Sequence, residues 1–552
     1  MSASTKDMPD ATNKNVAPLS TLRLRPMLGN WEIWGFGFAG LLLWILSATG
    51  AHAGLGPQAI FVWIPLTVVG IMINLQVRRM AAEWPDMAGG TPNYTGRLFN
   101  NSWFGRYAVM AYFQGWASVP TVSAIVLADV TQQNLTALGI FFPSWILKVA
   151  FTLLAFAIAF ASMRALSVLF LTFVVPAVGF LLLFSVQGAT WLVLSSNSPG
   201  LLPTDWGQFN FTEWAKWFFV ATYAVYAVET SSSFMADARN PSTILACLKR
   251  VTWAMPVVFI AGSWVLMRLS TGTDTYSDNI YQNLVQAALP FWGSFSNLMI
   301  MYFIVSACLL SCATGAANSP RVLYQLALDG KAAPVFGIAS RRNVPGPALV
   351  LTLVISLVFL LWGDMPRVLM VTGTGYFVIF LFMHLGIWLN RDKPYALWPW
   401  WSLAFFIAEL IIFVVGGIAW SWQDFLMGVF FPIAVMGVDA VIRRIPIGLF
   451  NPAWWQKMYT PKPAAEIRQG MNSHIFILIL FVCGAASIGW GISSLVDTVR
   501  NGPVSANMFA ILIMVIAFVG IAAAGWTTLP KLAALEDANE QDAAKGQQPL
   551  DR

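Results

Sequence analysis

Long apolar runs alternate with short polar segments over most of the chain. A run of about 20 apolar residues is long enough to cross a bilayer as an α-helix, and lipid offers no partner for unpaired backbone groups. The pattern predicts an all-α polytopic membrane protein with about fourteen transmembrane helices. These spans lie near residues 31–51, 57–77, 105–132, 144–163, 166–194, 213–235, 251–271, 292–323, 346–363, 366–389, 400–420, 423–442, 473–496 and 503–527.

The basic residues give this topology an orientation. With the N-terminus in the cytoplasm, most of the 31 Lys and Arg residues fall on the inner side. The outer side holds Lys148, Lys216, Arg268, Arg367 and Arg500. This asymmetry is the positive-inside bias of membrane proteins. It predicts a multi-pass protein of the plasma (inner) membrane with both termini cytoplasmic.

Composition narrows the function classes. The 552 residues are 58% hydrophobic and 10% charged, and mean hydropathy is +0.67, whereas soluble domains carry about 25% charged residues. Four cysteines and three histidines form no ligand motif, so no metal site and no cofactor are predicted. The absence of a convergent catalytic set argues against a membrane enzyme. The absence of a phosphate-binding Gly-Lys-Ser/Thr loop argues against an ATP-driven pump. Nothing in the charge balance indicates nucleic acid.

A lone acid, Glu229, stands at the centre of the apolar span 213–235. An acid at mid-membrane costs roughly 2.5–3.5 kcal/mol on insertion scales, so it usually faces a cavity, a partner or a pathway. Two interpretations stay open. Glu229 carries or gates a coupled proton, or it makes a structural hydrogen bond that ties the sixth span to its neighbours.

The first span holds three glycines in its first half, Gly35, Gly37 and Gly40. Glycine permits close helix packing and also weakens a helix. The second property predicts an interruption near residues 39–43, whose free amide groups would bind a substrate carboxylate. Carbonyls left unpaired near residues 222–226 of the sixth span would then receive an ammonium group.

Three further stretches carry a family resemblance. They are residues 83–94 (Glu-Trp-Pro-Asp-Met-Ala-Gly-Gly-Thr-Pro-Asn-Tyr), residues 223–241, where Glu229 precedes Asn240-Pro241 by eleven residues, and residues 319–330 (Ser-Pro-Arg-Val-Leu-Tyr-Gln-Leu-Ala-Leu-Asp-Gly). In this order and spacing, the chain resembles the amino acid–polyamine–organocation permease superfamily from about residue 31 to residue 395. It departs from the family in the first span, which reads Gly40-Leu-Leu-Leu-Trp, and at Ala227, where the family usually has glycine.

The resemblance implies an architecture and a site. The architecture is a five-plus-five inverted repeat (LeuT-like) over residues 31–395, about four additional helices over 396–530, and polar tails at 1–30 and 531–552. The substrate would lie at mid-membrane between the broken first and sixth helices, near an aromatic residue of the tenth. The implied substrate-binding residues are Ala39, Gly40, Leu41, Leu42, Tyr223, Ala224, Val225, Tyr226 and Tyr376.

The resulting hypothesis is a secondary-active permease for an amino acid or a related small amine, working by alternating access with proton coupling at Glu229. A site without fixed charge favours a neutral zwitterion or a hydrophobic amine. Sodium coupling is an alternative, because Ser311 and Thr314 could supply oxygen ligands between the first and eighth spans. A sensor or scaffold without turnover is another.

Three other ionisable residues, in or at the ends of predicted spans, bear on function. Glu409, outside the ten-helix core, is interpreted as a helix-packing or oligomer contact rather than a transport residue. His52 and His384 lie at span ends, where a satisfied interfacial histidine is the default and a pH sensor is the alternative.

Overall fold

The computed structural model describes residues 23–459, apart from 101, 138, 140–141, 271–279, 341, 363 and 446–447. Helices account for nearly all regular structure in this part of the chain, and β structure is limited to an isolated parallel bridge between Leu28 and Ala238. The helices, with η marking 3-10 or π segments, are α1 (Asn30–Ala39), η2 (Gly40–Leu43), α2 (Trp44–Leu55), η3 (Gly56–Ala59), α3 (Ile60–Glu83), α4 (Thr91–Leu98), α5 (Trp103–Ala137), α6 (Ser144–Ala161), α7 (Met163–Leu194), α8 (Phe211–Val225), η4 (Tyr226–Asp237), α9 (Pro241–Met255), η5 (Pro256–Gly262), α10 (Ser263–Ser270), α11 (Ile280–Trp292), η6 (Gly293–Phe295), α12 (Ser296–Leu328), η7 (Pro334–Gly337), α13 (Gly346–Leu360), α14 (Met365–Leu389), α15 (Pro399–Arg444), η8 (Gly448–Phe450) and α16 (Pro452–Tyr459).

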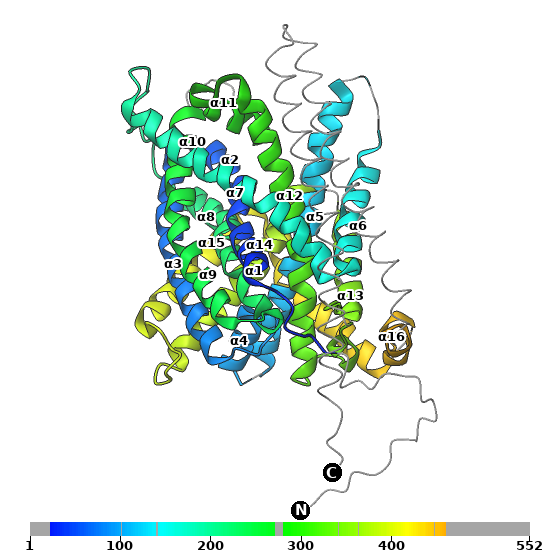
Figure 1. The fold of residues 1–552 in the computed structure, drawn as a ribbon. Coiled ribbons are helices and arrows are strands. Elements are labelled where there is room, and N and C mark those ends of the chain that lie inside the picture. The colour runs from blue at the N-terminus through cyan, green and yellow to red at the C-terminus, as the bar shows by residue number, and fades with distance from the viewer. Residues whose placement is uncertain are drawn as a thin grey trace, which may run out of the picture.

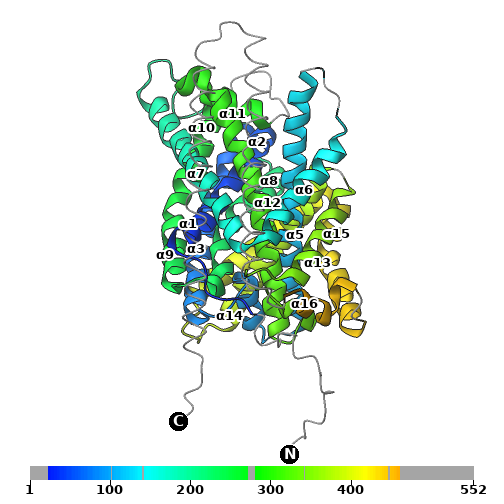
Figure 2. The same ribbon diagram turned by 45° about the vertical axis from the view of Figure 1, so that its right-hand side comes forward.

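The long helices run side by side between two ends of a bundle (Figure 1). The short helices α4 and α16 lie at the lower end and α11 lies at the upper end, an arrangement that is kept in the rotated view of Figure 2. We call these the α4 end and the α11 end. Because the long helices run from one end of the bundle to the other, the segments that connect them lie at the two ends, as expected for a chain that crosses a membrane repeatedly.

Apolar length supports this membrane assignment. Seven helical stretches in the described residues are long and apolar enough to cross a bilayer. The twelve predicted spans up to residue 442 all fall on helical segments. The predicted boundary between the spans 400–420 and 423–442 is also found, because Ser421 leaves helical geometry inside α15, with φ −165° and ψ 109°. Several predictions lie outside the described residues. They are the spans 473–496 and 503–527, the C-terminal polar tail, the N-terminal polar tail apart from residues 23–30, and therefore the count of fourteen spans.

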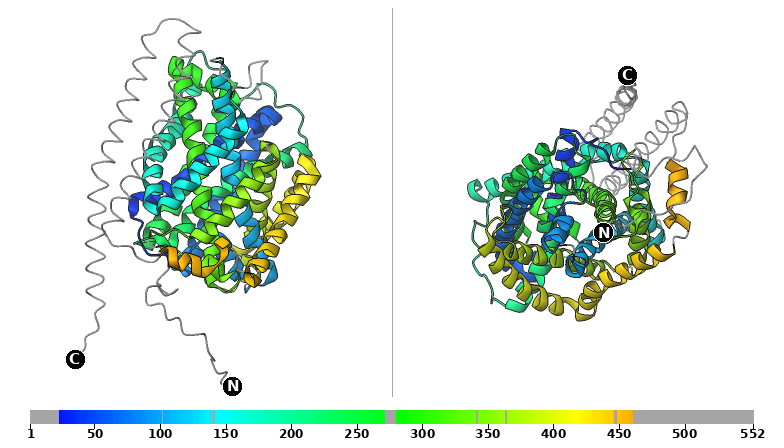
Figure 3. Two further views of the ribbon diagram at one scale, coloured as in Figure 1. Left: turned by 90° about the vertical axis from the view of Figure 1, so that its right-hand side faces the viewer. Right: turned by 90° about the horizontal axis from the view of Figure 1, so that it is seen from below.

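The additional helix α15 is an integral part of the bundle. It packs against α14, α8 and α5, and Figure 3 shows it in yellow along one side. The packing is close, since a Cβ added to Gly416 would lie 2.3 Å from the carbonyl oxygen of Ala215 on α8. Small residues let transmembrane backbones approach in this way. The C-terminal part of the described chain therefore contacts the same helices that carry the candidate site.

Candidate functional site

Two interrupted helices meet in the middle of the bundle. The first runs as α1, η2 and α2, with four residues of 3-10 geometry at Gly40–Leu43. The second runs as α8 and η4, changing to 3-10 geometry at Tyr226. The turns η2 and η4 contact each other. A 3-10 segment within a transmembrane helix often marks a hinge or a functional site. The first helix therefore changes geometry at the predicted position, near residues 39–43, whereas the free amide groups expected there stay a prediction.

Gly40 is the point of closest approach. A Cβ built on Gly40 would lie 2.7 Å from the carbonyl oxygen of Ala227 and 2.9 Å from the Cα of Val228. Both are backbone atoms of η4, which cannot rotate out of the way as a side chain can. Gly40 is thus small enough to let η2 and η4 touch. The glycine allows close packing at the same place where the helix changes to 3-10 geometry.

The second interruption begins later than expected. The carbonyl of Thr222 still accepts a hydrogen bond from the N–H of Tyr226, and the 3-10 geometry begins at Tyr226. The carbonyl of Ala227 accepts the hydroxyl of Thr230. The expectation of unpaired carbonyls over residues 222–226 is therefore wrong at Thr222. This stretch contains neither glycine nor proline, so its backbone keeps bonding as the helix tightens.

A cluster of buried aromatic rings lies beside the interruptions. Tyr376 of α14 makes edge contacts with Tyr112 and Trp116 of α5 and with Tyr223 of α8, at centroid distances of 5.9, 5.5 and 6.0 Å. The hydroxyl of Tyr376 has no hydrogen-bond partner among the described residues, and that of Tyr223 lies near the hydroxyl of Ser123. Buried polar groups are nearly always bonded, so the unbonded hydroxyl of Tyr376 calls for a ligand or water.

Glu229 is fully buried one turn along η4, at the centre of a hydrogen-bond network. It accepts the hydroxyl of Tyr112 at 2.6 Å, that of Ser232 at 2.9 Å and that of Thr91. The hydroxyl of Tyr112 in turn accepts the amide of Asn318 on α12, at 3.2 Å. Three donors on one carboxylate suit the ionised form. The network joins the aromatic cluster to Glu229 through Tyr112.

The glycine pair in residues 83–94 explains how Thr91 reaches Glu229. Gly89 and Gly90 have φ of +77° and +61°, a region that favours glycine. The N–H of Gly89 donates to the carbonyl of Ser233 at 2.9 Å, and a Cβ on Gly90 would lie 2.6 Å from the Ser233 nitrogen. The segment therefore lies directly on η4, with Thr91 at the first position of α4.

The three stretches that carry the family resemblance converge here. Thr91 bonds Glu229, and the N–H of Ala88 donates to the side chain of Gln325 on α12 at 3.1 Å. The stretches are recognisable in the sequence, whereas the contacts between them are not. Thr91, Tyr112 and Asn318 were missed as site residues. A threonine directly after Gly-Gly was the available signal for the first, and no sequence signal marked the other two.

A buried ion pair closes the α4 end below the site. Arg321 of α12 binds both carboxylate oxygens of Asp237, at 2.8 and 3.0 Å, and both side chains are almost fully buried. The guanidinium also lies over the ring of Phe234, 5.0 Å from its centroid. Phe234 stacks on Phe36 of α1 at 4.2 Å. These contacts join η4, α12 and α1.

Residues 24–28, which we call the leading segment, cover this ion pair. The N–H groups of Met27 and Leu28 both donate to the carbonyl of Asp237 at 2.8 Å, and the N–H of Arg239 donates to Leu28 at 3.0 Å. The N–H of Arg25 donates to the side chain of Asn343 at 3.0 Å. The leading segment thus runs beside the end of η4 like a short strand.

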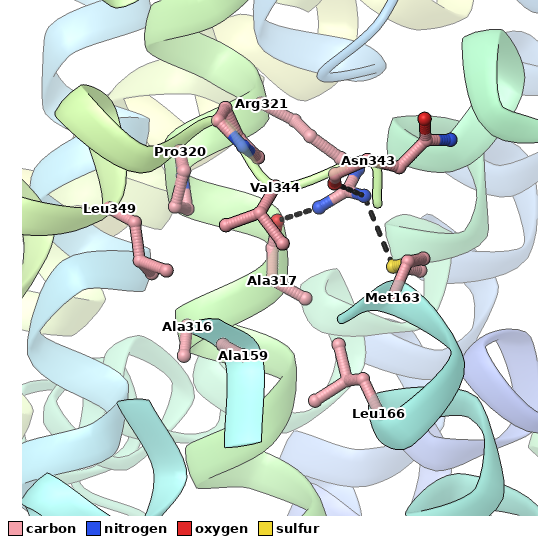
Figure 4. A pocket seen from close by; sticks show the side chains of 11 residues that line it. Ala159, Met163, Leu166, Ala316, Ala317, Pro320, Arg321, Asn343, Val344 and Leu349 are labelled. Atoms are coloured by element: carbon pink, nitrogen blue, oxygen red, sulfur yellow. Dashed lines mark hydrogen bonds between the residues drawn. The ribbon is translucent and has the colours of Figure 1, made fainter. Parts of the chain in front are cut away.

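A small pocket opens next to the ion pair, between α6, α7, α12 and the segment before α13 (Figure 4). Arg321 borders it and donates to the carbonyl of Asn343 at 3.4 Å and to the sulfur of Met163 at 3.1 Å. The nitrogens of Arg321 are therefore all directed at protein acceptors, although the side chain borders the pocket.

The predicted site residues are distributed unevenly around the interruptions. Ala39, Gly40, Leu41 and Leu42 are buried at η2, and Tyr223, Ala224 and Val225 end α8. Tyr376 and Tyr223 point their rings at each other. The side chain of Tyr226 is directed away from this cluster, because its hydroxyl donates to Glu409 of α15. Ser311 and Thr314 are buried on α12 and donate to Ala307 and Leu310 of their own helix, at 2.6 and 2.7 Å.

The two histidines at span ends, His52 and His384, are both fully buried inside the protein. Their position at the membrane interface stays a prediction. His384 lies 2.9 Å from the second carboxylate oxygen of Glu409, since α15 covers α14 at this level. Glu409 does make the expected contact between helices, and that contact includes the start of η4.

These features define a class. Membrane-crossing helices, two paired interruptions and a buried, uncharged aromatic site beside a single bonded acid are the features of a transporter of small polar molecules. A sequence model of the amino acid permease family matches residues 36–442. The chain belongs to this family, within the superfamily that the motifs indicated, and it is a multi-pass membrane transporter rather than an enzyme.

Individual relatives are distant. The chain is 26% identical to the lysine-specific permease of Lactococcus lactis, over 61% of this chain and 70% of the relative. It is 25% identical to the L-asparagine permease 1 of Mycobacterium bovis, over 56% of this chain and 64% of the relative. A match to the dicarboxylic amino acid permease of Saccharomyces cerevisiae is 26% identical and covers 26% of each chain.

Proposed function

We propose that this chain is a secondary-active permease that moves an amino acid or a related small amine by alternating access. The supporting observation is the meeting of η2 and η4 at Gly40, together with the buried hydroxyl of Tyr376, which lacks a partner in the described structure. Opening of η2 would free backbone amides for the substrate carboxylate, and opening of η4 would free carbonyls for its ammonium group. The Arg321–Asp237 pair would be the closed gate on one side.

The substrate we propose is a neutral zwitterion or a hydrophobic amine. The relatives' names refer to a basic, a neutral and an acidic amino acid, so likeness at 25–26% identity does not select among them. The site itself does offer a reason. Tyr223, Tyr376 and Trp116 carry no charge, and the oxygens of Glu229 already accept three hydroxyls. A charged substrate side chain would lack a partner, which is costly in a buried site.

Glu229 is the proposed proton site. All its described bonds are accepted from hydroxyls, as suits a carboxylate. A protonated Glu229 must donate as well, so at least one hydroxyl would have to turn and accept. Because the donors come from α4, α5 and η4, proton uptake would loosen contacts between those elements. This is the physical link we propose between proton binding and opening.

Orientation and architecture belong to the same proposal. The α4 end would face the cytoplasm, because Arg78, Arg79, Arg97 and Arg106 lie near it in the chain. The interruptions in the first and sixth helices fit equivalent positions of a five-plus-five inverted repeat over residues 31–395. The protein would lie in the plasma (inner) membrane with both termini inside.

Uptake into liposomes tests this function. Purified protein is reconstituted, and a panel of labelled amino acids and amines is offered under an imposed proton gradient and then a sodium gradient. Accumulation with the proton gradient supports the proposal. Accumulation with sodium alone would assign coupling to the Ser311 and Thr314 region instead. Folded protein without flux for any compound would favour a sensor without turnover.

The variant Glu229→Gln isolates the coupling step. It keeps the size of the side chain but cannot release a proton, so we expect accumulation against a gradient to be lost or to become independent of pH, at near-normal expression. Glu213→Gln is the matched control, because Glu213 is a half-exposed acid at the start of α8, paired with Lys216. An unchanged pH profile in Glu229→Gln would remove Glu229 from the coupling mechanism.

A further inference from the structure

A second buried acid lies on the opposite side of η4 from the expected substrate site. Glu409 of α15 accepts the hydroxyl of Tyr226 on one carboxylate oxygen, and its other oxygen lies 2.9 Å from Nδ1 of His384 on α14. All three side chains are at most 2% exposed. The cluster therefore joins the first residue of η4 to two helices that follow the motif-bearing part of the chain.

The cluster contains a buried carboxylate with no cationic partner other than a histidine among the described residues. Among the described residues, Glu409 forms no ion pair with a lysine or an arginine. An ionised Glu409 with a neutral His384 leaves a net charge of −1 among buried rings, which is unfavourable at membrane depth. One more proton, shared between the imidazole and the carboxylate, brings the pair to zero. Histidine is the side chain that most readily changes charge near neutral pH.

The second ring nitrogen of His384 supports a proton path. Nε2 is buried and has no hydrogen-bond partner in the described structure. With Nδ1 engaged by Glu409, Nε2 is the atom at which a proton is gained or lost. In the charged form it is a donor without an acceptor, which a buried group rarely remains. A water molecule next to Nε2 would accept this hydrogen bond and could then take up the proton.

The surroundings place few other charges near the pair. Phe405 lies 5.6 Å from the His384 ring, and Phe380 lies 4.7 Å from the Tyr226 ring. The titratable and charged groups contributed by the packed elements are Glu229 and Asp237 on η4, Glu213, Lys216 and Tyr223 on α8, Arg106, Tyr107, Tyr112 and Asp129 on α5, Tyr94 and Arg97 on α4, Arg367 and Tyr376 on α14, and Asp424, Asp439, Arg443 and Arg444 on α15. Several are engaged elsewhere, since Tyr112 bonds Glu229, Tyr107 bonds the carbonyl of Val429, and Asp439 pairs with Arg106 and Arg443.

We propose that His384 and Glu409 form a second proton-binding site, separate from Glu229, which controls how firmly η4 is held to α15 through Tyr226. Release breaks the Nε2–H bond of the imidazolium, leaves the electron pair on nitrogen and passes the proton to water. The carboxylate then relies on the Tyr226 hydroxyl, so η4 is held more firmly at high pH. Proton uptake frees η4 to move. The consequence for transport rests on the proposed function, whereas proton binding itself does not.

Histidine-selective NMR tests the binding directly. The chain has three histidines, so ¹⁵N-labelled histidine in lipid nanodiscs gives an assignable spectrum. We expect one signal to change between about pH 5 and pH 8. That signal should vanish in His384→Gln and remain in His52→Gln, the matched buried control. A His384 signal that stays neutral over the whole range would overturn the proposal.

Two variants have opposite expected effects. Glu409→Gln removes the counter-charge of the imidazolium, so a smaller share of the His384 signal should be in the protonated form at a given pH than in the wild type. Tyr226→Phe removes a donor from the carboxylate, which then holds the imidazolium more strongly, so the midpoint should rise. Equal midpoints in wild type and Tyr226→Phe would contradict the linkage, and this variant keeps the ring packing if Glu409→Gln does not fold.

Transport completes the test. Initial uptake of the best labelled amino acid from the panel is measured between pH 5 and pH 8. We expect the wild-type rate to fall as pH rises, and the fall to be weaker in Tyr226→Phe and still present in Glu213→Gln. If the protein moves no compound, the proposed function fails while the NMR titration still decides proton binding. Flux without a His384 titration would refute only the second site.

Discussion

Replacing Gly40 with alanine tests whether the two interruptions must touch. The added Cβ would lie 2.7 Å from the carbonyl oxygen of Ala227, whereas ordinary contact begins at 3.4 Å, so η2 and η4 must separate by about 0.7 Å. Overpacking of this kind costs about 1–3 kcal/mol. Alanine recovers about 0.5–1 kcal/mol of helix propensity. We expect a net loss of roughly 0–2.5 kcal/mol in stability, together with a larger loss of uptake because both backbone sites move.

The control is Gly437→Ala on α15. Gly437 also lies within a helix, and a Cβ there would meet no atom within 4 Å. It isolates the propensity gain, so its unfolding temperature should equal or exceed that of the wild type. Thermal unfolding in detergent and uptake into liposomes are measured for both variants. If Gly40→Ala unfolds no earlier than Gly437→Ala and transports normally, the close contact between η2 and η4 is not required.

Three further variants address the gate and the site. Arg321→Met leaves Asp237 buried without its partner and should lower the free energy of unfolding by about 3–5 kcal/mol. The double variant Arg321→Met/Asp237→Leu should lose less in thermal unfolding, and a double variant less stable than Arg321→Met would contradict a simple ion pair. Tyr112→Phe removes the 2.6 Å donor to Glu229, a charged hydrogen bond worth about 1.5–3 kcal/mol, and should shift the pH profile of uptake without abolishing binding. Tyr223→Ala removes a ring and a hydroxyl from the expected site and should raise KM roughly tenfold, equivalent to about 1.4 kcal/mol; an unaltered KM would move the substrate site elsewhere.

Sequence patterns predicted what depends on local order along the chain. Apolar runs located the helices, and glycine density located the interruption at η2, because both are properties of one segment. Glu229 stood out since a charge in an apolar span is conspicuous by itself. Even the break at Ser421 followed from the polar Trp-Ser-Trp-Gln-Asp stretch between two apolar runs.

Partners across the chain could not be predicted in the same way. Thr91 and Glu229 are 138 positions apart, and Arg321 and Asp237 are 84 positions apart. Which helix packs on which is set by tertiary contacts that a single sequence does not display. The contact between His384 and Glu409 was missed for this reason, because the packing of α15 on α14 is a tertiary contact. The late start of the interruption at Tyr226 likewise depends on hydrogen bonds that residue type alone does not fix.

The strand-like contact between the leading segment and the end of η4 has a mechanical consequence. Three backbone hydrogen bonds join Met27 and Leu28, directly before α1, to Asp237 and Arg239 at the end of η4. The first and sixth helices are therefore fastened together at one end and in contact at their interruptions. They would move together, so a displacement of η2 would also displace η4.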